Sequence, residues 1–205
     1  MKRSSLLLLI GVALAGVAVA FAVSILHDGL SSRATPTAVE AALARNLRHL
    51  VISSTARSAQ NPLLDSPEDQ RDARRHFADH CAICHANDGS GDSAFGAGLY
   101  PKPPDLRLPH TQELTDGELF WIIENGVRFT GMPAFAIPDH GGQVESWKLV
   151  HFIRHLPHLA PAERFEMEKY NPKGSDERAE EQEENDFLNQ ATPTQKPESQ
   201  NHHQE

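Results

Sequence analysis

The sequence predicts an all-α protein, in which a transmembrane helix at the N-terminus precedes a small domain of three main helices separated by long loops. Three observations lead to this fold class. The chain opens with a long apolar run, and two later segments pair helix-capping residues with apolar positions at helical spacing. The longest loop is rich in glycine and proline, which disfavours strands. An apolar fraction of 39% over 205 residues leaves room for only a small core.

The apolar run covers residues 6–26 and contains neither a charge nor a proline. A helix of this length spans about 30 Å, the thickness of a hydrocarbon core, whereas a signal peptide has an apolar region of roughly 7–15 residues. The length favours an uncleaved anchor over residues 1–27, although the A-x-A form of residues 18–20 leaves a cleaved signal segment open. Because Lys2 and Arg3 precede the run, the positive-inside rule places the rest of the chain outside the cytoplasm.

Residues 28–65 are predicted to form a juxtamembrane helix followed by a linker. Within residues 37–52, apolar side chains recur at helical spacing, namely Val39, Leu43, Leu47, Leu50 and Val51. Two placements of this helix stay open, one near the membrane surface and one packed on the globular domain. Residues 53–64 have the composition of a linker, which would let the following domain swing between partners.

The globular domain is predicted to cover residues 66–160. Its first helix begins after the N-cap residue Ser66, and its second begins with the capping box of Thr115. A third helix is expected over about residues 143–156, before a proline that ends it. The connecting residues 86–109 form a long loop without strand character. A domain with so much loop buries a thin core, and such domains usually need a disulfide, a metal or a cofactor.

The C-terminal residues 161–205 are predicted to be an acidic, disordered tail. They contain 12 Asp and Glu against five Lys and Arg, a net charge of −7 out of −9 for the whole chain. The acidic run at 180–184 is interpreted as a solvated segment, with docking to a basic partner as the alternative. No clustered Lys and Arg face is present, so no nucleic-acid partner is expected.

The two cysteines of the chain, Cys81 and Cys84, lie three residues apart, and His85 follows directly. A redox disulfide of this spacing normally sits in a βαβ pattern, which is missing here. A structural zinc site would need a second pair of ligands, which only distant histidines could supply. Attachment of a c-type haem explains all three residues, because the thiols form thioether bonds to the vinyl groups and the histidine reaches the iron. The sequence therefore predicts one covalently attached haem c.

The second axial ligand of the haem iron is predicted to be Met132. Of the other methionines, Met1 is cytoplasmic or removed, and Met167 lies in the charged C-terminal segment. Met132 stands between Gly131, which permits close approach of backbone to the ring, and Pro133, which stiffens the loop. His85 and Met132 are thus the predicted metal ligands.

Several other histidines are candidates for metal ligation. His110 and His140 are the rivals of Met132 for the sixth position. His151 and His155 have the spacing of a metal pair on one helix face, but a solvated face is the preferred interpretation. The remaining histidines near the motif or in the tail are assigned no ligand role, and these are His80, His158, His202 and His203.

Residues from about 66 to 156 resemble the class I cytochromes c, specifically the bacterial monohaem group. A C-x-x-C-H motif, a Gly-Met-Pro loop and a final helix with an aromatic residue follow in that order. The resemblance implies that the first helix crosses the last through the sides carrying Phe77 and Trp147. It also implies that a proline carbonyl, of Pro103 or Pro104, accepts a hydrogen bond from His85. Three further side chains are candidate walls of the haem pocket or propionate partners, namely Tyr100, Trp121 and Arg128.

A haem with both axial positions filled by protein transfers electrons rather than turning over a substrate, so we expect no enzyme activity. The leading hypothesis is electron transfer in a respiratory chain by a carrier anchored in the bacterial inner membrane through residues 6–26, with its haem domain in the periplasm and redox proteins as partners. A fixed cytochrome subunit of a larger dehydrogenase or oxidase is the alternative, and a haem sensor with a labile methionine is a third.

Overall fold

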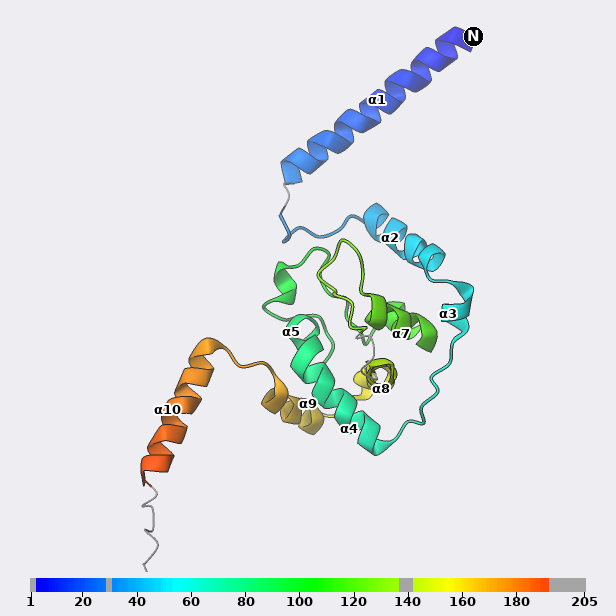
Figure 1. Ribbon diagram of the computed structural model, residues 1–205. Coiled ribbons are helices and arrows are strands. Elements are labelled where there is room, and N and C mark those ends of the chain that lie inside the picture. The colour runs from blue at the N-terminus through cyan, green and yellow to red at the C-terminus, as the bar shows by residue number, and fades with distance from the viewer. Residues whose placement is uncertain (1–2, 29–30, 137–141, 192–205) are drawn as a thin grey trace, which may run out of the picture. The chain divides into compact units, whose positions relative to one another are not determined.

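The computed structural model describes residues 3–28, 31–136 and 142–191. All regular structure in these ranges is helical (Figure 1), which confirms the all-α prediction. The chain divides into two units, residues 1–171 and residues 172–205.

The helices have the following bounds. The α-helices are α1 (Arg3–Asp28), α2 (Ala38–Val51), α3 (Ser54–Ser58), α4 (Pro67–His76), α5 (Ala82–His85), α6 (Pro109–Gln112), α7 (Asp116–Asn125), α8 (Gly142–His155), α9 (Pro161–Met167) and α10 (Ser175–Ala191). The short helices of other types are η1 (Phe77–Cys81), η2 (Gly96–Gly98), η3 (Leu156–His158) and η4 (Glu168–Tyr170).

Helix α1 contains the predicted apolar run. Its residues Ser4–Ser24 are long and apolar enough to cross a membrane, and none of them is buried by protein. This length and composition suit a membrane anchor or a signal sequence.

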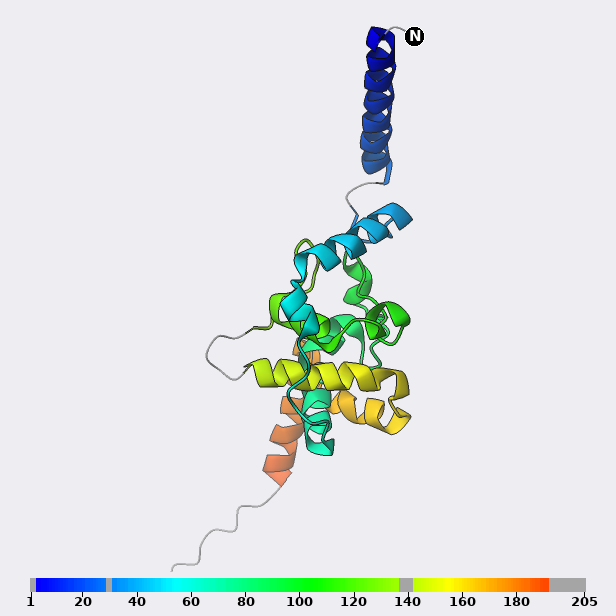
Figure 2. The ribbon, with the colours of Figure 1, turned by 90° about the vertical axis from the view of Figure 1, so that its right-hand side faces the viewer.

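The core of the domain forms where α4 and η1 cross α8 (Figure 2). Phe77 packs against Phe152 with ring centroids 5.2 Å apart, and both side chains are almost fully buried. Trp147, one turn earlier on α8, stacks on Phe120 of α7 at 4.1 Å. Burying one such aromatic side chain contributes about 2–3 kcal/mol, so these contacts fasten the first and last helices of the domain.

Helix α7 begins and ends where the sequence predicts. The Thr115 hydroxyl accepts a hydrogen bond from the Glu118 N–H at 3.1 Å, and the Glu118 carboxylate accepts one from the Thr115 N–H at 2.9 Å. Gly126 ends the helix with a φ of 64°, a conformation that glycine adopts without strain. The reciprocal bonds fix the start of the helix that leads into the methionine loop.

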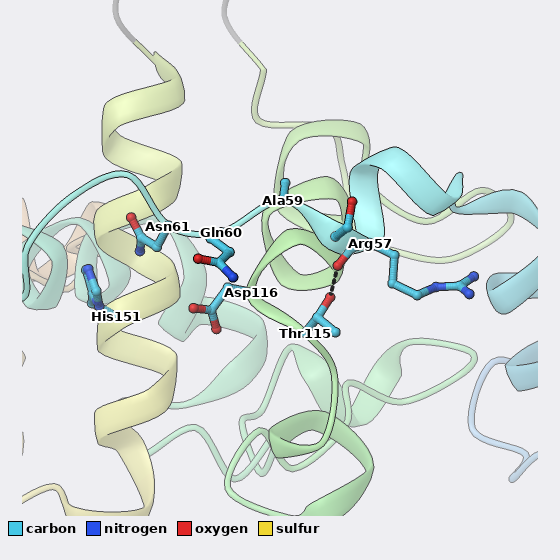
Figure 3. Close-up of a pocket in the computed structure, with 8 residues that line it drawn as sticks. Arg57, Ala59, Gln60, Asn61, Thr115, Asp116 and His151 are labelled. Atoms are coloured by element: carbon cyan, nitrogen blue, oxygen red, sulfur yellow. Dashed lines mark hydrogen bonds between the residues drawn. The ribbon is translucent and has the colours of Figure 1, made fainter.

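The domain starts earlier than the predicted residue 66. Ile52 is 1% exposed, and the Thr115 hydroxyl donates to the Arg57 carbonyl at 2.7 Å (Figure 3). The Asn61 amide donates to the Trp147 carbonyl at 2.9 Å. The expectation of a free linker over residues 53–64 is therefore wrong, because this polar segment docks through backbone and amide groups that hydropathy does not register.

Replacing Gly117 with alanine is expected to weaken this docking. A Cβ atom at Gly117 would lie 2.0 Å from the Ala56 carbonyl oxygen, so the backbone of α3 would have to move away from α7. Overpacking of this kind costs about 1–3 kcal/mol, more than the roughly 1 kcal/mol that alanine gains over glycine in a helix. Denaturant unfolding and limited proteolysis near residues 53–60 would measure the effect. Gly98→Ala is the matched control, because its Cβ would meet nothing within 4 Å.

The domain also ends later than the predicted residue 160. Met167 on α9 is fully buried in the core, and Arg74 of α4 pairs with Glu163 at 2.5 Å and with Glu166 at 3.0 Å. In the second unit, α10 is helical. Residues 161–167 thus pack on the domain, and the disorder predicted for the rest of the tail stays a prediction. Pro161 favours a helix start, and a single flexible methionine fills the core gap despite its charged neighbours.

Glu163 should make the attachment of α9 sensitive to acid. Burial raises the pKa of this carboxyl, but hydrogen bonds from His155 and from the Ala160 N–H outweigh it and hold the pKa below the usual value of 4.5. A carboxyl group with a depressed pKa stabilises the folded state at pH values above its usual pKa. This contribution is lost as the pH falls through the pKa of the folded state. Wild type should exceed Glu163→Gln by about 1 kcal/mol in unfolding free energy at neutral pH. Unfolding measured below pH 4.5 should show this difference shrinking, and a constant difference would contradict the assignment.

Candidate functional site

The Cys-x-x-Cys-His motif lies at the end of the first domain helix. Helix α4 continues into the π-helical turn η1, which contains Cys81, and then into α5, which ends with Cys84 and His85. Residues three apart on a helix share a face, so the two sulfurs point to the same side. Ala86 follows with a φ of 58°, which turns the chain away directly after the histidine. Single π-helical turns occur often at functional sites.

Both thiols lie in an environment that keeps them protonated. Burial, followed by the neighbouring Cys84, raises the pKa of Cys81 to about 12. Burial also raises the pKa of Cys84. Among the described residues, no three His, Cys, Asp or Glu side chains gather in a way that could hold a metal ion. The geometry thus disfavours the zinc alternative.

The ring of His85 presents a buried nitrogen. Nδ1 of this residue is buried, and no group among the described residues meets hydrogen-bond geometry with it. Burial lowers the pKa of His85, and the Pro104 carbonyl opposes this effect. Of the two prolines that the resemblance leaves open, Pro104 supplies the carbonyl that affects this pKa. Such a carbonyl orients an iron-ligating histidine through the nitrogen that does not bind the metal.

A glycine brings the proline segment to the histidine. The Gly91 N–H donates to the His85 carbonyl at 2.8 Å. Gly91 has a φ of +76°, and a Cβ atom there would lie 2.5 Å from the Pro103 carbonyl oxygen. Only glycine allows this approach, so the loop after the motif is built around a close backbone contact beside the predicted haem-attachment residues.

Ser93 and Gly96 hold the following loop against the motif. The Ser93 hydroxyl lies 2.7 Å from the Ile83 carbonyl and 3.0 Å from that of Cys84. A Cβ atom on Gly96 would lie 2.5 Å from the Cys84 carbonyl oxygen. Sequence reasoning missed both residues, because a serine and a glycine in a Gly-rich loop carry no local signal of a contact to a helix end.

The methionine loop meets this same loop from the other side. The Val127 N–H donates to the Met132 carbonyl at 3.1 Å, and the Met132 N–H donates to the Thr130 hydroxyl at 3.1 Å. A Cβ atom on Gly131 would lie 2.8 Å from Leu99, which directly follows η2. Residues 96–99 therefore contact Cys84 at one end and Gly131, the neighbour of Met132, at the other. They link the Cys-x-x-Cys-His motif to the loop that contains Met132.

The other candidate residues have different surroundings. The Tyr100 hydroxyl is 3.3 Å from Glu40 of α2. Trp121 is half-buried, and Arg128 and His110 are exposed. His140 lies outside the described residues, as do His202 and His203.

The histidines of α8 have structural partners. His151 Nε2 is 3.1 Å from the Leu63 carbonyl, and His155 Nε2 is 2.9 Å from the Glu163 carboxylate. These contacts favour a packing role over the metal pair that their spacing allows.

A separate pocket of about 590 Å³ lies between the 57–61 segment, the start of α7 and α8 (Figure 3). Its lining residues are Arg57, Ser58, Ala59, Gln60, Asn61, Thr115, Asp116 and His151. Asp116 is paired with Arg154 at 2.8 Å. None of the predicted haem residues lines this pocket, so it is distinct from the haem-attachment site.

Comparison with protein families gives a match over the helical domain. Residues 68–153 match the family model described as cytochrome C oxidase, cbb3-type, subunit III. No curated protein matches the chain. The matched residues run from the start of α4 nearly to the end of α8 and include both cysteines, His85 and Met132.

Proposed function

We propose that residues 68–153, which match a c-type cytochrome family model, form a class I c-type cytochrome domain with covalently bound haem c, and that the protein is a membrane-anchored monohaem electron carrier. In this proposal Cys81 and Cys84 hold the haem, and His85 and Met132 ligate its iron. The haem supplies a one-electron couple between ferrous and ferric iron when bound. Redox proteins are the partners of such a domain.

The observation that carries the proposal is the chain of contacts between the motif and the methionine loop. Gly96 lies on the Cys84 carbonyl, and Leu99 lies against Gly131. If His85 and Met132 held one haem between them, their loops would have to stay at a fixed separation, and this bridge supports that arrangement. Nδ1 of His85 is buried and has no hydrogen-bond partner among the described residues, and the Pro104 carbonyl raises the pKa of the ring. Both observations fit an imidazole that would bind iron through its other nitrogen.

The same loops support outer-sphere electron transfer rather than substrate turnover. With both axial positions occupied, the chain offers the haem no free coordination site. Large apolar side chains stay exposed around the loops, with Ile83 at 48%, Phe95 at 57% and Phe129 at 92%. We propose that these side chains contact redox partners, since apolar surface near a buried cofactor favours short-lived docking.

The membrane placement rests on α1. A helix that is long and apolar enough to span a bilayer precedes the haem domain, and Lys2 and Arg3 stand on its N-terminal side. The positive-inside rule then supports a cytoplasmic N-terminus and a haem domain in the periplasm of the bacterial inner membrane.

A second candidate is a fixed subunit of a respiratory oxidase, favoured by the description of the matching family model. Solubilising membranes in a mild detergent and separating them by size distinguishes the two. A mobile carrier should elute as a haem protein of its own mass of 22.6 kDa plus bound detergent. Elution in a stoichiometric complex with other haem or copper subunits would favour the fixed subunit over the mobile carrier.

A further inference from the structure

Helix α2 presents its apolar side away from the protein. Its apolar residues recur at intervals of four, four and three, which places them along one side of the helix. They are exposed by 77%, 57%, 49% and 79%, in the order Val39, Leu43, Leu47 and Leu50. An ordinary surface helix buries such a stripe against its own domain.

The opposite side of α2 faces the domain. Ala41, Ala42 and Arg48 are half-buried, and the Nε atom of Arg48 is fully buried. Glu40 meets Tyr100 of the haem domain at 3.3 Å, and the C-cap residue Ile52 is 1% exposed. The helix therefore contacts the domain through its small and polar side. Its apolar stripe stays exposed and is available to contact something other than this domain.

The position of α2 in the chain points to that neighbour. Only nine residues separate the end of α1 at Asp28 from the start of α2 at Ala38. Nine residues reach at most about 30 Å when fully extended. If α1 crosses the membrane, the bilayer surface is always within reach of the stripe, and the short tether allows even weak intrinsic binding to be occupied most of the time.

We propose that α2 lies in the membrane interface, with Val39, Leu43, Leu47 and Leu50 inserted among the lipid acyl chains next to the anchor. Amphipathic helices bind bilayers in this way, with the apolar side buried at the boundary between headgroups and acyl chains. The proposal rests on the assignment of α1 as a membrane anchor. It combines the two placements that the sequence leaves open, since α2 would touch both the domain and the lipid.

This placement changes how the haem domain meets its partners. Because α2 and the docked 52–63 segment connect the domain to the interface, little free chain remains for the swinging motion that a long linker would allow. Electron donors and acceptors must therefore meet the haem close to the membrane surface.

Quenching of a site-attached fluorophore in lipid vesicles tests the proposal. Full-chain holoprotein carrying Leu43→Cys or Arg45→Cys is labelled with a small thiol-reactive probe, because the native cysteines are consumed by thioether bonds. Both positions are exposed. Arg45 points away from Leu43 and, unlike Ala41 and Arg48, is not half-buried against the domain. Each variant is reconstituted in phosphatidylcholine vesicles with or without brominated acyl chains, and the ratio of the two readings cancels absorption by the haem.

We expect brominated lipid to quench the Leu43 probe several-fold more than the Arg45 probe, and iodide in the water to show the reverse order. Equal quenching of both probes by iodide would overturn the proposal. Shielding of the Leu43 probe from both quenchers would overturn it too, because a second copy or another protein would then cover the stripe.

A third probe, at Val12→Cys in α1, separates this inference from the proposed function. Strong lipid quenching at Val12 without lipid quenching at Leu43 would leave the anchor intact and reject only the interfacial helix. Absence of lipid quenching at Val12 would reject the anchor, and the interfacial helix with it.

Discussion

The double variant Cys81→Ala, Cys84→Ala is expected to contain no covalently bound haem and to lose the folded domain. The loops from residue 86 to residue 109 contain only single turns of helix, and their closest contacts converge on the motif through Gly91, Ser93 and Gly96. Without the cofactor these loops lose the group around which they close. Folding that depends on a bound group is lost with that group, as in small metal-binding domains.

Haem staining after a denaturing gel and far-ultraviolet circular dichroism would measure both losses. The single variant Cys81→Ala is the control, because Cys84 can still form one thioether bond and retain part of the haem signal. A double variant with native helix content would show that the helical core around Phe77, Phe152 and Trp147 holds the fold without the cofactor.

Replacing Met132 should leave the haem attached and change its sixth coordination position. Met132→Ala is expected to bind carbon monoxide rapidly in the reduced state, because the iron has lost one protein ligand. Met132→His should lower the reduction potential by a sizeable part of the roughly 0.8 V range that axial ligands cover, since a thioether favours the ferrous state more than an imidazole does.

Met167→Leu is the matched control for both variants. Met167 is fully buried in the core, far from solvent and with no predicted ligand role. This volume-conserving exchange should cost less than about 1.5 kcal/mol and leave the potential unchanged. If wild type binds carbon monoxide as fast as Met132→Ala, the methionine is labile and the protein is a sensor rather than a carrier. If the reduction potential changed in His110→Ala but not in Met132→Ala, the sixth ligand would be His110 and not Met132.

The parts of the fold that follow local rules were predictable from the sequence. The capping box of Thr115, the N-cap of Ser66 and the stop at Gly126 each depend on residues within one turn, and all three occur as expected. The attachment motif is equally local, because its spacing alone places two thiols and an imidazole on adjacent helical positions. These features needed no knowledge of tertiary contacts.

The parts that depend on distant contacts were not predictable. The 52–63 segment is polar, yet it docks through the Thr115 hydroxyl and the Asn61 amide, so its composition suggested a free linker. Met167 has charged neighbours, yet it fills the core. The contact of Leu99 with Gly131, which links the two halves of the site, joins loops about 30 residues apart, and neither periodicity nor capping signals report such a contact.

A redox titration of the full-chain holoprotein followed by optical absorption tests the proposed ligation of the haem. We expect one reversible one-electron transition from a single haem that is low-spin and six-coordinate in both oxidation states, because His85 and Met132 would both ligate its iron. A five-coordinate haem in either state, more than one transition, or no haem absorption at all would contradict it.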